Sequence, residues 1–121
     1  MRILVTGSRD WDNEEAVHRA IFRELYIMKC PHGEAALIHG ACPTGADAMA
    51  SAYAHQSGMH VISHPANWER DGKSAGFRRN AEMVNEGADI CLAFIKNGSR
   101  GASMTANLAE KAGIHTVRYI T

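Results

Sequence analysis

The feature of this sequence that most constrains its fold is a regular alternation of short apolar runs with segments whose apolar residues recur at helical spacing. The apolar runs predict strands at 3–6, 35–39, 60–63, 90–95 and 116–120. The helical spacing predicts helices near 13–29, 44–57, 77–84 and 102–112. Strands that alternate with helices indicate a parallel sheet with right-handed crossovers and helices on both faces. We therefore predict an α/β fold, a three-layer sandwich around a mostly parallel five-stranded sheet.

Length and charge narrow the classes of protein to consider. The 121 residues fit one domain, which we expect to span 1–121 without a linker. Lysine plus arginine and aspartate plus glutamate both total 13, so the formal net charge is zero. General nucleic-acid binders usually carry a basic excess, so we expect no nucleic-acid partner. No apolar run reaches the length of a membrane span, so we expect a cytoplasmic protein without a membrane partner.

The cysteines and histidines form no recognisable disulfide or metal pattern. Cys30, Cys42 and Cys91 are widely spaced and include no CxxC pair, which argues against a zinc ribbon or a disulfide framework. His60 and His64 lie four positions apart on one predicted strand and share a face. No HExxH motif or mixed Cys/His cluster accompanies them, so we expect no metal site.

The predicted ligand site lies at the carboxyl edge of the sheet. Ligands of open parallel sheets bind beyond the carboxyl ends of the strands, where helix N-termini favour anions. The strand-to-helix loops at that edge are 7–11, 40–45, 67–74 and 96–101. If the first strand is central, the first and last of these loops flank the crevice. Both contain Gly, Ser and Arg, which suit a phosphate because glycine lets the backbone approach and arginine offers a bidentate fork. The alternative for either loop alone is a tight turn with a solvated arginine.

Two aspartates are expected near helix N-termini. Thr44 and Asp47 fit the capping box S/T-x-x-D/E, so we expect Asp47 mainly to cap its helix, although it can face a ribose as well. We expect Asp12 to cap the first helix, because the acids Glu14 and Glu15 follow in its opening turn.

Aromatic and basic side chains are expected to complete the site. Trp11 and Trp68 fall in edge loops and can stack on a base, and the alternative is that each packs on the core as a lid. Arg78 and Arg79 do not share a helix face, so at most one is expected to reach the pocket, and the alternative is a solvated helix face. His39 ends a strand and is a candidate polar group in the pocket.

The motifs of these loops, taken together and in order, resemble a known family. They are Gly7-Ser8-Arg9-Asp10-Trp11, the stretch 39–47, Trp68, the stretch 72–76 with Arg79-Asn80 and Met83, Ala93-Phe94, and Gly98-Ser99-Arg100-Gly101. The set resembles the YspA-like (cpYpsA-related) branch of the SLOG superfamily, whose members are frequent in bacteria and phages. The resemblance implies a Rossmann-like fold and the binding of nucleotides or their derivatives, such as ADP-ribose-like molecules.

The residues and the resemblance together give a predicted ligand site. It comprises Gly7, Ser8, Arg9, Asp10, Trp11, His39, Gly40, Thr44, Gly45, Asp47, Trp68, Lys73, Arg79, Asn80, Gly98, Ser99, Arg100 and Gly101. Superfamily relatives called LOG enzymes are nucleotide phosphoribohydrolases with a Pro-Gly-Gly-x-Gly-Thr-x-x-Glu loop. Here Ala102 follows the last glycine and Thr105 stands at the catalytic glutamate position, so we expect no LOG-type hydrolysis.

Two functions follow as hypotheses. The first is a sensing or sequestering domain for a phosphate-bearing, nucleotide-derived small molecule, with no cofactor required. The alternative is a hydrolase that cleaves a glycosidic or phosphate bond of such a molecule, with Asp10 or Glu69 as candidate general base. A homodimer or higher homo-oligomer is compatible with the resemblance, because superfamily relatives often dimerise.

Overall fold

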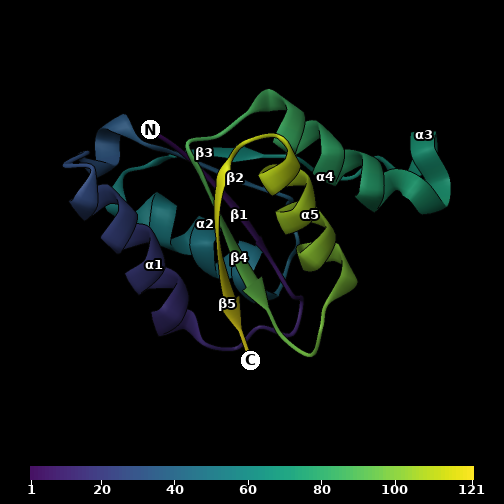
Figure 1. Ribbon diagram of the computed structural model, residues 1–121, viewed down its shortest axis with the longest axis horizontal. Coiled ribbons are helices and arrows are strands. Elements are labelled where there is room, and N and C mark those ends of the chain that lie inside the picture. Colours follow the sequence, from purple (N-terminus) through teal and green to yellow (C-terminus); the bar gives the residue numbers. More distant parts are fainter.

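The computed structural model describes residues 1–121 and contains a five-stranded parallel sheet with helices on both faces (Figure 1). All neighbouring strand pairs are parallel, and the strand order is β3-β2-β1-β4-β5, so β1 is central. The strands are β1 (Arg2–Gly7), β2 (Ala36–His39), β3 (His60–Ser63), β4 (Ile90–Ile95) and β5 (His115–Ile120). The predicted Rossmann-like α/β fold is confirmed.

The helices cover the sheet from two sides, and Figure 1 shows α1 and α2 on one face and α4 and α5 on the other. The α-helices are α1 (Glu14–Ile27), α2 (Gly45–Ser57), α3 (Trp68–Asp71), α4 (Ala75–Glu86) and α5 (Arg100–Lys111), and short 3₁₀ turns are η1 (His32–Glu34) and η2 (Gly72–Ser74). None of these helices combines the length and the apolar character that crossing a membrane requires.

The two faces of the sheet carry separate apolar clusters because side chains alternate along each strand. On β1, Ile3 and Val5 pack with the α1 and α2 side, whereas Leu4 packs with Met83 of α4 on the other side. Strand β4 is buried at every position, which explains its uninterrupted apolar sequence. The core therefore fixes the register of the strands whose carboxyl ends form the site.

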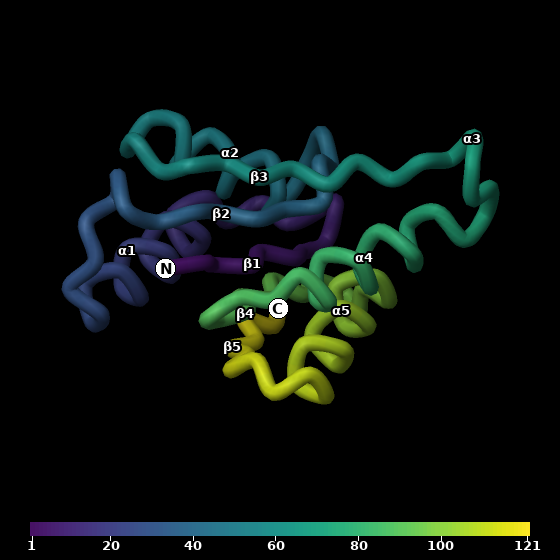
Figure 2. Tube along the Cα trace, turned by 90° about the horizontal axis from the view of Figure 1, so that it is seen from above, coloured from purple at the N-terminus to yellow at the C-terminus, as the bar shows by residue number.

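Two local predictions differ from the structure. Asn13, not Asp12, caps α1, because its Oδ1 accepts a hydrogen bond from the Ala16 amide at 3.1 Å. The Asp12 carboxylate instead lies 3.1 Å from the Lys96 Nζ. The segment predicted as the loop 67–74 contains α3 and η2, and Figure 2 shows α3 extending beyond the rest of the fold.

The sheet reverses its strand order between β1 and β4. The chain leaves β1 toward β2 on one side and later returns to β4 on the other. Gly7 at the end of β1 pairs with Phe94, and the Ser8 amide donates to the Phe94 carbonyl at 2.9 Å. The loops after β1 and β4 therefore open side by side, at the place where ligands bind in open α/β sheets.

Candidate functional site

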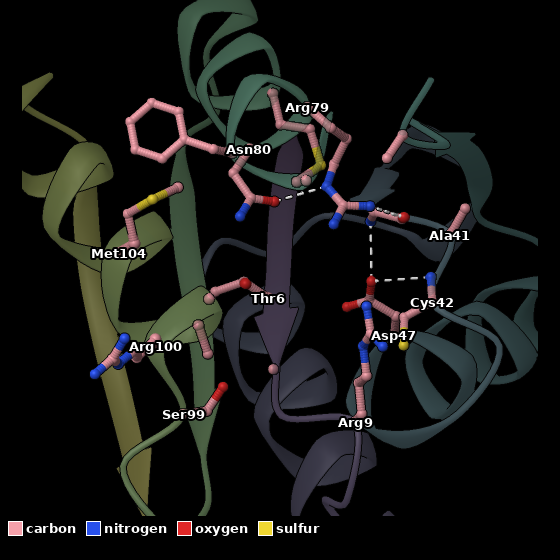
Figure 3. A pocket seen from close by; sticks show the side chains of 18 of the residues that line it. Thr6, Arg9, Ala41, Cys42, Asp47, Arg79, Asn80, Ser99, Arg100 and Met104 are labelled. Atoms are coloured by element: carbon pink, nitrogen blue, oxygen red, sulfur yellow. Dashed lines mark hydrogen bonds between the residues drawn. The ribbon is translucent and has the colours of Figure 1, made fainter. Parts of the chain in front are cut away.

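A cleft of about 780 Å³ occupies the carboxyl edge of the sheet. Its walls come from the loops after β1, β2 and β4, from the start of α5, and from α3 and α4 (Figure 3). Eleven residues of the predicted site line it: Gly7, Arg9, Asp10, Gly40, Asp47, Trp68, Arg79, Asn80, Ser99, Arg100 and Gly101. The cleft therefore lies at the sheet edge where the reversal of strand order predicts ligand binding.

Seven residues of the predicted site lie outside this lining: Ser8, Trp11, His39, Thr44, Gly45, Lys73 and Gly98. Lys73 and Gly98 are exposed next to the cleft rather than in it. The other five have structural contacts that account for their positions. Of the two candidate catalytic carboxylates, Asp10 lines the cleft, whereas Glu69 on α3 is exposed and does not.

Ser8 and Trp11 hold the loop after β1 in place. The Ser8 hydroxyl accepts from the Lys96 amide at 2.7 Å and contacts the Lys96 carbonyl at 3.3 Å, so it links the loops after β1 and β4. Trp11 is only 5% exposed and packs edge-on against Phe94, with ring centroids 5.3 Å apart. Its indole Nε1 donates to the Asn13 carbonyl at 2.9 Å. The structure contradicts a role for Trp11 in stacking on a ligand, because its ring is part of the core.

His39 and Gly45 are buried beside the cleft. The His39 Nδ1 accepts from the Ala41 amide at 2.9 Å, so the side chain turns back on its own loop. Burial, followed by the nearby His55 and His64, lowers the pKa of His39. Gly45 has a φ of +72° and starts α2 directly against the backbone of the loop after β1.

Asp47 does not close a capping box with Thr44. The Thr44 hydroxyl donates to the Arg9 carbonyl at 3.0 Å, and Thr44 makes no side-chain cap to α2. The Asp47 Oδ2 instead accepts from the amides of Gly40 at 3.1 Å and Cys42 at 3.4 Å (Figure 3). The predicted cap is therefore wrong, and Asp47 stabilises the loop that precedes its helix.

The environment of Asp47 disfavours its charge. Burial raises the pKa of Asp47 to about 6, while the two backbone N–H groups and the Arg79 guanidinium act in the opposite direction. The second carboxylate oxygen, Oδ1, is buried and has no hydrogen-bond partner in the protein.

Arg79 reaches over the carboxyl edge from α4. Its Nη1 donates to the Gly40 carbonyl, and its Nε donates to the Asn80 Oδ1 at 2.7 Å (Figure 3). A Cβ atom on Gly40 would lie 2.8 Å from this Nη1, so a side chain there would require the guanidinium to shift. Arg78 is exposed and lies outside the cleft, near Asp71.

The opposite side of the cleft is suited to an anion. Ser99 precedes α5 without a side-chain cap, no acid lies in the first turn, and the amides of residues 100–102 donate to no group of the protein. Such free N–H groups and the positive end of the helix dipole favour negative charge. Arg100 on this side of the cleft and Arg9 beside Asp47 (Figure 3) make no ion pair, whereas Lys96 is paired with Asp12.

An apolar part of the lining was not found from the sequence. Phe77 and Met83 of α4 and Met104 of α5 line the cleft, together with the predicted Trp68. The signal was available in the helical spacing, because Met104 lies one turn after Arg100 and shares its helix face. Trp68 is 56% exposed and Phe77 is 58% exposed, which leaves both rings free to contact a ligand.

Comparisons with known proteins identify the family of this chain. The profile of the family described as "YspA, cpYpsA-related SLOG family" matches residues 1–70, which include the loops after β1 and β2. The Gene 61 protein of Mycobacterium phage D29 is 41% identical over 123 residues, which cover 98% of this chain and 95% of that protein. The chain belongs to the YspA, cpYpsA-related SLOG family.

Proposed function

We propose that the cleft binds a phosphate-bearing, nucleotide-derived small molecule and that the protein acts as a sensing or sequestering domain. The observation that carries this proposal is the start of α5, where three amides have no acceptor and Arg100 makes no ion pair. Arg9, which also makes no ion pair, lines the cleft on the side of Asp47 (Figure 3). Arginine guanidinium groups and free helix N-termini are the usual donors to phosphate oxygens. Membership of the SLOG family points to the same class of ligand.

The size and lining of the cleft suit a nucleotide. A volume of about 780 Å³ lies within the range of small-molecule sites, roughly 300–1,000 Å³. The exposed rings of Trp68 and Phe77 offer apolar faces for a base, because aromatic side chains stack favourably on flat ring systems. The phosphate and the base of one ligand would thus contact different walls of the cleft.

The acidic residues favour binding over hydrolysis. Thr105, at the position of the LOG catalytic glutamate, is fully buried, and its hydroxyl donates to the Gly101 carbonyl at 3.0 Å. The α5 terminus therefore offers phosphate-binding amides without an adjacent carboxylate. Of the two alternative candidates for a general base, Asp10 lines the cleft and Glu69 does not.

Replacing Arg9 or Arg100 by alanine is expected to weaken ligand binding by about 1.5–3 kcal/mol, because each change removes a charge-assisted hydrogen bond to phosphate. Isothermal titration calorimetry with AMP and with ADP-ribose measures the effect. Arg78→Ala is the matched control, since Arg78 is exposed and lies outside the cleft, and its affinity should match the wild type. Unchanged affinity in both the Arg9 and the Arg100 variants would place the phosphate elsewhere.

A further inference from the structure

One oxygen of the Asp47 carboxylate is a buried polar atom without a hydrogen-bond partner. Oδ2 accepts two backbone hydrogen bonds, whereas Oδ1 is buried and accepts none. Asp47 as a whole is only 6% exposed. Buried polar atoms are nearly always hydrogen-bonded in folded proteins, and a carboxylate oxygen without a donor is costly. A structure that keeps such an oxygen calls for an explanation.

No donor of the protein is placed to satisfy Oδ1. The nearby cation is Arg79, and its hydrogen bonds go to the Gly40 carbonyl and the Asn80 Oδ1 instead. Asp47 lines the cleft, and Figure 3 shows its carboxylate on the same side of the cleft as Arg9, across from Ser99 and Arg100. Because Asp47 lines the cleft, a ligand bound there is a candidate source of the missing donor.

We propose that the Asp47 Oδ1 accepts a hydrogen bond from an O–H or N–H group of the bound ligand, so that the cleft selects phosphates that also carry such a donor. This inference rests on the proposed function and specifies its ligand further. An ionised carboxylate is acceptor-only and repels phosphate, whereas Arg9, Arg100 and the α5 amides attract it. The cleft thus favours one molecule that carries both a phosphate and a hydrogen-bond donor.

A nucleoside monophosphate offers that donor in two places, the ribose hydroxyls and an amino group of the base. Both present the same chemistry to Oδ1, a neutral donor to a carboxylate. The burial that raises the pKa of Asp47 to about 6 still leaves the carboxylate ionised at pH 7, so it acts as an acceptor in neutral solution.

The test compares three ligands on the wild type by isothermal titration calorimetry at pH 7.5. They are AMP, 2′,3′-dideoxy-AMP, which lacks the ribose hydroxyls, and purine riboside 5′-monophosphate, which lacks the base amino group. We expect one of the two analogues to bind about 10-fold or more weakly than AMP, because it leaves the buried oxygen unpaired. The analogue that is affected identifies the donor.

Asp47→Asn then links the effect to this residue. The amide oxygen can keep the contacts with Gly40 and Cys42, while the amide nitrogen takes the place of the acceptor at Oδ1. In Asp47→Asn, the affected analogue should bind as tightly as AMP. In the control Arg78→Ala, the same analogue should still bind more weakly than AMP, as it does to the wild type. Thermal unfolding followed by circular dichroism checks that the variant folds, and the comparison of ligands on the wild type needs no variant.

The outcomes separate this inference from the proposed function. If AMP binds and both analogues bind as tightly as AMP, the inference is overturned and the phosphate site stands. A penalty that persists in Asp47→Asn overturns it as well, because another residue then recognises the donor. A wild type that binds neither these three phosphates nor ADP-ribose overturns the proposed function, and the inference falls with it.

Discussion

Replacing Gly45 by alanine is expected to destabilise the protein by about 2–5 kcal/mol. Two costs add at this position. A Cβ atom would lie 2.2 Å from the Ser8 carbonyl oxygen and 2.8 Å from that of Arg9, so backbone atoms would have to move, at about 1–3 kcal/mol. The φ of +72° adds about 1–2 kcal/mol of strain for a residue with a side chain. Urea unfolding of the two proteins measures the difference.

Gly98→Ala is the matched control for this change. Gly98 also has a positive φ, +64°, but a Cβ atom there meets nothing within 4 Å, so only the backbone strain applies. We expect it to cost about 1–2 kcal/mol. Equal losses in the two variants would mean that the loop after β1 does not pack against the start of α2 as the structure shows. That packing matters for the site, because it sets the distance between Arg9 and α2.

The stability of the wild type relative to Asp47→Asn is expected to fall by about 2–3 kcal/mol as the pH rises from 4 to 7. Burial raises the pKa of Asp47 from 3.8 to about 6, so the folded state binds this proton more tightly than the unfolded state does. The stabilisation from the bound proton is complete below pH 3.8 and is lost as the pH rises through 6. One pKa unit corresponds to about 1.4 kcal/mol, which gives the size of the effect.

Denaturant unfolding of both proteins at several pH values measures this difference, and the other titrating groups cancel in the comparison. The relative stability should be constant above pH 7 and should change most between pH 4 and 6. A difference that stays flat would contradict the burial of the Asp47 carboxylate. A difference that grows in favour of the wild type with rising pH would show that Arg79 and the backbone amides outweigh burial.

The fold could be predicted because its signals are local. Each strand is a short apolar run and each long helix has its own apolar periodicity, so the alternation alone indicates a parallel sheet. The central position of β1 was only a condition in the sequence analysis, and the strand order β3-β2-β1-β4-β5 shows that it is met. The helix α3 was missed because four residues are too short for a periodic signal.

The sequence was sufficient to place the site at the correct edge of the sheet. It was not sufficient to predict which way individual side chains point. From the sequence alone, Trp11 is a loop tryptophan without an evident packing partner. In the structure it packs against Phe94, which lies far along the chain. Thr44 and Asp47 have the spacing of a capping box, yet Thr44 turns to the Arg9 carbonyl of another loop. Long-range contacts of this kind compete with local patterns and leave no local trace in the sequence.

The central claim is that the cleft holds a phosphate-bearing nucleotide derivative between Arg9, Arg100 and the start of α5. Native mass spectrometry of the freshly purified protein, before and after addition of AMP or ADP-ribose, tests it most directly. We expect one nucleotide-derived molecule per chain, either co-purified or added, and a loss of that complex in Arg100→Ala. A wild-type protein that remains free of ligand in the presence of millimolar AMP and ADP-ribose would contradict it.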